Sequence, residues 1–96
     1  MKGLLIYFQV IEGKQPQFEA AVEALVAQVR AHDRRYELYS LAKLRQSNVS
    51  YVMVERFESA EAQEAHRNHP YVIEAMPKID ACLAGTPVVE WLDFIS

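Results

Sequence analysis

The stretch "VERFESAEAQEAHRNHPY", residues 54–71, reads as the end of a strand that runs directly into a short helix. Ser59 is a favourable residue to cap the start of that helix, and Pro70 follows its end. The helix carries two histidines three positions apart, His66 and His69. Such imidazoles bind a metal, serve a catalytic site or cap a helix, and the rest of the chain has to distinguish these roles.

The segments before this stretch predict two strands, a helix and one earlier strand. Residues 35–44 and 50–58 are rich in β-branched and aromatic residues and flank a polar turn, so they predict an antiparallel hairpin. Apolar positions three and four apart predict a helix from about Pro16 to His32. An apolar run at residues 3–11 predicts the first strand.

The segments after it predict a helix interrupted at Pro77 and a last strand over residues 87–95. The order is therefore β-α-β-β-α-β, which is typical of a ferredoxin-like α+β fold: a four-stranded antiparallel sheet with helices on one face. We expect one such domain over residues 1–96.

Apolar side chains occupy both sides of the predicted strands. In the first strand Leu4, Ile6 and Phe8 alternate with Leu5 and Tyr7. A sheet with one face in water alternates cleanly between apolar and polar residues, and this sheet does not. Helices cover only one face, so we expect a second copy of the chain to cover the other in a homodimer.

Composition argues against several classes of partner. The formal net charge is −3 and there is no basic run, which gives nucleic-acid binding little electrostatic support. No segment is apolar over the length that a bilayer requires, so we expect no membrane partner and a cytoplasmic protein. The single cysteine rules out an internal disulfide and paired-cysteine metal motifs.

Two polar residues are candidates for chemistry. His66 follows Ala62 and Ala65, which favours a face of the helix that turns inward; it is either a hydrogen-bonded, half-buried histidine or a general base in a pocket. Glu55 lies among apolar residues in a strand and is either paired with an arginine or an acid that lines the pocket. His69, next to Pro70, is expected to cap carbonyl groups at the end of its helix. Two histidines do not make a catalytic zinc site, so no metal is expected.

Large, soft side chains near these two residues suit a flat aromatic ligand, although such residues more often form core. They are Tyr51, Met53, Phe57, Tyr71 and Met76. The glycines are isolated, so there is no motif for a flavin or nicotinamide cofactor, and none is expected.

The segment from Tyr51 to Tyr71 resembles the antibiotic biosynthesis monooxygenase (ABM) family of dimeric α/β-barrel proteins. The pattern is a strand with Glu-x-aromatic, a serine, a helix with a histidine, and a turn with an aromatic residue. The segments "GKQPQFEAAVEAL" and "YELYS" resemble the family's first helix and second strand. The resemblance implies a ferredoxin-like protomer, a dimer formed sheet against sheet, and a ligand cavity between sheet and helices.

Characterised members of that family include cofactor-free oxygenases that act on quinols and polycyclic phenols. The residues typical of the aromatic-polyketide oxygenases are replaced here by Met53, Phe57 and Gln63. Those of the haem-degrading branch are replaced by Ile6, His66 and Met76, so haem degradation is disfavoured.

His66 matches the quinol-monooxygenase-like members best, and the resemblance implies that it is the pocket histidine. Two hypotheses follow: a small cofactor-free oxygenase of quinols or phenols, or a non-catalytic dimeric module that binds small molecules or acts in a stress response.

Overall fold

Phe18, Val22, Leu25 and Val29 form the buried stripe of the first helix, α1 (Gln15–His32), in the computed structural model, which describes residues 1–96. Their spacing of three and four residues places them on one side of the helix, as the sequence predicts. Pro16 lies in the first turn, where its missing N–H is not needed. This stripe packs against one face of the sheet and contributes four of the 12 residues of the buried apolar core.

The sheet contains four antiparallel strands in the order β2-β3-β1-β4. Their bounds are β1 Lys2–Gln9, β2 Tyr36–Lys43, β3 Ser50–Phe57 and β4 Val88–Asp93. The predicted hairpin is confirmed, since β2 pairs with β3. With α1, α2 (Ala60–Arg67) and α3 (Pro70–Asp80), the order is that of the ferredoxin-like fold.

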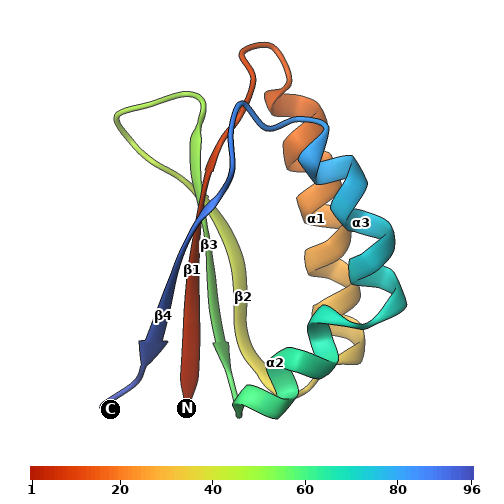
Figure 1. Ribbon diagram of the computed structural model, residues 1–96, viewed down its shortest axis with the longest axis vertical. Coiled ribbons are helices and arrows are strands. Elements are labelled where there is room, and N and C mark those ends of the chain that lie inside the picture. The colour runs from red at the N-terminus through yellow and green to blue at the C-terminus, as the bar shows by residue number, and fades with distance from the viewer.

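All three helices lie on one side of the sheet (Figure 1). Strand β4 is the farthest from them, and both termini lie at the same end of the sheet (Figure 1). Side chains of alternate strand residues point to opposite faces, so Tyr51, Met53, Glu55 and Phe57 of β3 share the face toward the helices. All four are buried, whereas Val52 and Val54 on the opposite face are only half-buried.

The open face of the sheet is partly covered by the residues that follow β4. Phe94 lies against Gly3, where a Cβ atom would collide with the ring, so this position accepts only glycine without displacing Phe94. The Arg56 guanidinium lies 4.1 Å from the Phe94 ring centroid, a cation–π distance. No helix covers this face.

Helix α2 starts as the sequence predicts, because the Ser59 hydroxyl accepts a hydrogen bond from the Ala62 N–H at 3.1 Å. The prediction that His69 caps carbonyl groups at the end of α2 was wrong. Its Nδ1 accepts a hydrogen bond from the Tyr71 N–H at 3.3 Å, so it caps the start of α3 and no carbonyl of α2. Pro77 lies inside α3, which continues to Asp80.

None of the three helices combines the length and the apolar composition needed to cross a lipid bilayer.

The packing around Phe18 yields a stability prediction. Its ring is fully buried, with centroids 5.2 Å from Phe8 and 4.8 Å from Tyr51. We expect Phe18→Ala to lower the free energy of unfolding by about 3–5 kcal/mol, because it leaves a cavity between α1 and the sheet. The exposed Ile73 of α3 is the control, and Ile73→Ala should change stability by less than about 0.5 kcal/mol. Equal losses in urea unfolding would contradict this assignment of the core.

Candidate active site

Glu55 is a buried carboxyl group in the middle of a strand. Only 3% of the residue is exposed, and its cross-strand neighbours are Leu4 on β1 and Tyr39 on β2. No arginine pairs with it, because Arg35 binds Asp33 and Arg56 binds Glu37 on the open face. The sequence left an arginine ion pair as one alternative for Glu55, and the structure does not contain that pair.

Burial without a cation controls the protonation of Glu55. Removing the carboxylate from water disfavours its charged form and raises its pKa to about 8. The side chain is therefore mostly a neutral acid at pH 7, able to donate a hydrogen bond as well as accept one.

His66 faces Glu55's side of the sheet from helix α2. It is 5% exposed, and its ring centroid lies 4.6 Å from Tyr36, 5.1 Å from Tyr39 and 6.4 Å from Tyr71. Burial lowers the pKa of the imidazole to about 4, although the nearby Asp33 carboxylate acts in the opposite direction. The alternative of a hydrogen-bonded, half-buried histidine was therefore wrong: His66 is buried, its Nδ1 has no hydrogen-bond partner, and it is neutral at pH 7.

Tyr36 reaches this cluster through an irregularity in β2. Tyr36 and Tyr39 are three residues apart and would face opposite sides of a regular strand. The register shifts between Tyr36 and Leu38, so that Tyr36 lies opposite Phe57 and Tyr39 opposite Glu55. This β-bulge turns both tyrosines toward the helices, and such bulges often redirect a side chain at a functional site. Regular alternation, read from sequence, misses this arrangement.

Three buried polar atoms in this cluster have no hydrogen-bond partner in the protein: Tyr36 Oη, Glu55 Oε1 and His66 Nδ1. The fourth such atom of the chain, Arg56 Nε, lies on the other face of the sheet and has an ion-pair partner in Glu37 at 3.3 Å. Buried polar groups nearly always find partners, and leaving one without costs about 1–3 kcal/mol. Their concentration around His66 indicates a polar site that a ligand would complete.

An ion pair lies beside the cluster. Asp33 is buried and its carboxylate accepts hydrogen bonds from the Arg35 backbone N–H and from the Arg35 guanidinium at 3.1 and 3.3 Å. These bonds hold the pKa of Asp33 below its usual value despite the burial. Asp33 therefore supplies a fixed negative charge near His66.

The remaining predicted ligand-binding residues are only partly brought together. Phe57 is buried with its ring centroid 5.2 Å from Tyr36, and Tyr71 is half-buried beside His66. Met53 is part of the main core. Tyr51 lies about 13 Å along β3 from Glu55, and its hydroxyl donates to Glu19 on α1. Met76 is exposed on α3.

One cavity next to the cluster lies between α2 and strands β1 and β4 and has a volume of about 310 Å³. Phe57 and Gln63 line it, with Trp91 and the ends of β1 and β4. Phe57 also touches Tyr36, which in turn stacks on His66. The aromatic rings thus separate this cavity from the polar atoms of the cluster.

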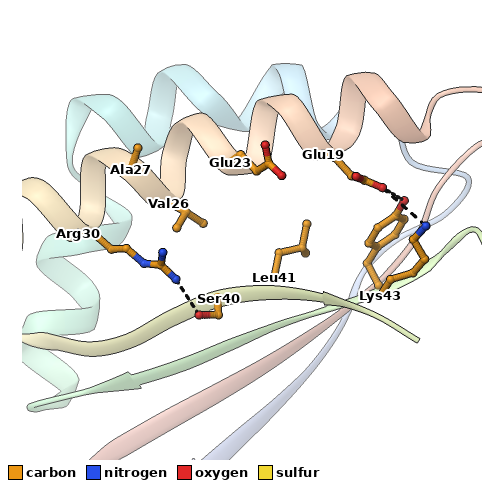
Figure 2. A pocket seen from close by; sticks show the side chains of 9 residues that line it. Glu19, Glu23, Val26, Ala27, Arg30, Ser40, Leu41 and Lys43 are labelled. Carbon is orange, nitrogen blue, oxygen red and sulfur yellow. Dashed lines mark hydrogen bonds and ion pairs between the residues drawn. The ribbon is translucent and has the colours of Figure 1, made fainter. Parts of the chain in front are cut away.

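A cavity of about 500 Å³ between α1 and β2 has a different character. Three of its four charged side chains have partners within the protein (Figure 2). Arg30 donates to Ser40, while Glu19 accepts from Tyr51 and lies 4.0 Å from Lys43; Glu23 is the exception. A further cavity of about 650 Å³ lies between α1 and α3. None of the three cavities is lined by His66 or Glu55, so the unpaired buried atoms, and not a cavity, are the reason that we place the candidate site at the cluster around His66.

The shifted pKa values give a pH dependence of stability. The folded protein keeps the Glu55 proton up to a pKa of about 8, whereas the unfolded chain releases it near 4.5, so this contribution to stability is lost as pH rises toward 8. His66 has the opposite effect on stability between pH 6.5 and 4. In that range the unfolded chain binds a proton on this imidazole, whereas the folded protein binds it only near pH 4, so stability falls as pH falls. Below pH 6.5 the effects of Glu55 and His66 on the free energy of unfolding oppose each other. Above pH 6.5 only the effect of Glu55 remains.

We therefore expect the free energy of unfolding to fall between pH 6.5 and 8, by up to about 1.4 kcal/mol per pH unit. Glu55→Gln should flatten this slope, because the amide does not titrate. Glu64→Gln, at an exposed position of α2, is the control and should keep the slope. Urea unfolding across pH tests this; equal slopes in wild type and Glu55→Gln would mean that Glu55 is ionised in the folded protein.

Comparison with known proteins identifies the family to which the chain is similar. The family model described as "Antibiotic biosynthesis monooxygenase" matches residues 1–78. No protein with curated annotation is significantly similar to the chain.

Solved structures share the fold over nearly the whole chain. A "putative antibiotic biosynthesis monooxygenase" from Caulobacter crescentus CB15 has 26% identity and a TM-score of 0.95, covering 99% of this chain and 90% of that one. Rv0793 from Mycobacterium tuberculosis has 20% identity and a TM-score of 0.89, with 99% and 95% covered. PA3566 from Pseudomonas aeruginosa has 21% identity and a TM-score of 0.87, with 99% and 94% covered. The family match and the ferredoxin-like arrangement agree, and this chain belongs to the antibiotic biosynthesis monooxygenase family.

Proposed function

We propose that this protein is a cofactor-independent monooxygenase that oxidises a small aromatic quinol or phenol with dioxygen. The observation that carries the proposal is the buried cluster in which Glu55, His66 and Tyr36 each present a polar atom without a partner, surrounded by aromatic rings. Membership of the family supports oxygenase chemistry in general, the choice of a quinol or phenol comes from the family resemblance, and the buried cluster is consistent with such a substrate.

The protein's task in such a reaction is to remove the phenolic proton. The phenolate ring is electron-rich and reduces dioxygen; a hydroperoxide forms on a ring carbon and loses water to leave a quinone. For a phenol with a free para position, the balance is phenol plus dioxygen to quinone plus water, with all four electrons from the substrate. A dry site with rigid rings favours this course by orienting the substrate and excluding solvent.

The pKa values decide which residue keeps the proton. A phenol has a pKa near ~10. Transfer to Glu55, with a pKa of about 8, is uphill by roughly 3 kcal/mol, whereas transfer to His66, with a pKa of about 4, is uphill by roughly 8 kcal/mol. We therefore assign Glu55, in its ionised form, as the final base. His66 relays the proton, accepting it at Nδ1 while Nε2 releases another.

This assignment predicts a loss of turnover when His66 is replaced. Proton transfer by a positioned group typically contributes ~10²–10⁴ in rate, so His66→Ala and His66→Gln should each lower the rate of oxygen uptake by about that factor. Because His66 is buried, His66→Ala should also cost roughly 0.5–3 kcal/mol of stability, and the glutamine variant serves to separate the two effects. His32, exposed in the last turn of α1, gives the control variant His32→Ala.

The assay is oxygen uptake with a panel of hydroquinones and naphthols and no added cofactor. Turnover should rise with pH toward about 8, as Glu55 ionises, and Glu55→Gln should abolish that rise. Full activity in both His66 variants would remove His66 from the mechanism. Binding of an aromatic ligand with no oxygen uptake would instead favour the non-catalytic binding module.

We also propose that the protein is a homodimer formed through the open face of the sheet. Apolar side chains point from this face: Leu5, Tyr7, Leu38, Val52, Val54 and Val88. All the helices lie on the other side (Figure 1), and a monomer rarely leaves an apolar face of this kind in water.

Val54→Lys should therefore weaken dimerisation, since it places an unpaired charge within the interface. Gln28→Lys makes the same charge at an exposed position of α1, away from the sheet, and should leave the dimer intact. Sedimentation at micromolar concentration measures both. A wild-type protein that sediments as a monomer would refute the dimer proposal.

A further inference from the structure

We infer that the cavity between α1 and β2 binds a linear ω-amino carboxylate, a small molecule with an ammonium group at one end and a carboxylate at the other. The inference goes beyond the proposed function and does not depend on it, because neither His66 nor Glu55 lines this cavity. The charges of the lining residues, and the apolar side chains between those charges, carry it.

Helix α1 and the edge strand β2 form the two walls of this cavity, which has a volume of about 500 Å³. Lining residues of α1 recur every three or four positions and so form one stripe along the helix: Glu23, Val26, Ala27 and Arg30. Leu41 of β2 faces Val26 across the cavity (Figure 2). The stripe thus runs from a carboxylate, over apolar side chains, to a guanidinium group.

The charges at the two ends of this stripe are not neutralised within the protein. Glu23 takes part in none of the ion pairs of the chain, and neither does Arg30. Arg30 donates from Nη2 to the Ser40 hydroxyl at 2.9 Å and to the Tyr39 carbonyl at 3.3 Å. These neutral acceptors hold the guanidinium in place, while the N–H groups of Nε and Nη1 remain free to bind a ligand.

The other two charged residues of the cavity compensate each other. The Glu19 carboxylate accepts a hydrogen bond from the Tyr51 hydroxyl at 2.5 Å and lies 4.0 Å from the Lys43 ammonium (Figure 2). An anionic ligand at Arg30 would leave Glu23 uncompensated, and a cationic ligand at Glu23 would leave Arg30 uncompensated. A ligand that carries both charges compensates both residues.

A metal ion does not suit this cavity. Glu19 and Glu23 lie one turn apart on α1, but no third histidine, cysteine or acidic residue joins them in a group that could hold a metal. The carboxylate of Glu23 is therefore better matched by an ammonium group, which pairs with a single carboxylate through a charge-assisted hydrogen bond.

The spacing along α1 indicates the length of the ligand. Seven residues separate Glu23 from Arg30, which is about 10.5 Å along the helix axis. A charge-assisted hydrogen bond at each end takes up about 3 Å, so about 5 Å remains between the ammonium nitrogen and the carboxylate. A straight chain of about four to six carbon atoms spans that gap and packs its methylene groups on Val26 and Leu41. An α-amino acid, with both charges next to one carbon atom, is too short.

NMR titration of the ¹⁵N-labelled protein at pH 7 tests the inference, with 5-aminopentanoate as the probe. Both of its ends are charged at this pH. We expect the amide signals of Val26 and Leu41 to shift with a Kd of about 0.1–1 mM, in keeping with a ligand of this size. Pentanoate and pentylamine each lack one charge, and each should bind about tenfold more weakly, the effect of losing one charge-assisted hydrogen bond.

Two variants remove the charges of the protein one at a time. Glu23→Gln should weaken the binding of 5-aminopentanoate about tenfold and leave that of pentanoate unchanged. Arg30→Gln should weaken the binding of 5-aminopentanoate by a similar factor and leave that of pentylamine unchanged. Because Glu23 is exposed, the melting temperature of Glu23→Gln should equal that of wild type.

Glu74→Gln is the matched control. It makes the same change at an exposed position of α3, in the cavity between α1 and α3, and should keep the affinity of wild type for 5-aminopentanoate.

Other outcomes overturn the inference. A wild type whose signals at α1 and β2 do not shift, equal affinities for the three probes, or an affinity for 5-aminopentanoate that survives in Glu23→Gln would each do so. Signals that shift only along the cavity between α1 and α3 would do so as well. Failure of the proposed oxygenase activity is a separate result, because this titration involves neither dioxygen nor a phenol.

Discussion

The burial of Glu55 is the constraint on which the arrangement of the candidate site depends. A carboxyl group in the middle of a central strand, with no cation beside it, is destabilising in its charged form, so the fold holds it as a neutral acid. The elements around it supply aromatic rings: Tyr36 and Tyr39 from β2, Phe57 from β3 and Tyr71 from α3. Packing of these rings excludes water, and exclusion of water in turn keeps His66 neutral.

Two local features bring the polar groups of this cluster together. The Ser59 cap fixes the first turn of α2, which sets the direction in which His66, seven residues later, faces the sheet. The bulge in β2 places Tyr36 beside it. Together these two features bring the carboxyl group of Glu55, the imidazole of His66 and the hydroxyl of Tyr36 to the same face of the sheet. An open polar site would have left these groups solvated, with ordinary pKa values and less effect on a bound phenol.

The two faces of the sheet differ in what covers them, and this difference is related to the small size of the chain. Helices α1 and α3 cover the side that holds the core and the candidate site, while the apolar side chains of the opposite face have no cover within the chain (Figure 1). A protein of this size buries a limited core, and association of two sheets is a common way to add to it. The candidate site and the proposed dimer interface lie on opposite sides of the same strands, and the pleat of β3 separates Glu55 from Val54.

The sequence by itself determined the order of elements, the hairpin, the buried stripe of α1 and the cap at Ser59, because each depends on residues close together in the chain. It also singled out His66 and Glu55 as candidate site residues. The tertiary structure decided the rest. It placed Tyr36 in the cluster through a bulge that breaks the alternation of a regular strand, and it moved the capping role of His69 to the following helix. It also left Met76 exposed and Tyr51 near α1, away from the cluster. Burial by distant elements sets both the packing partners and the pKa values, and such burial is a property of the folded chain that no local pattern of residues contains.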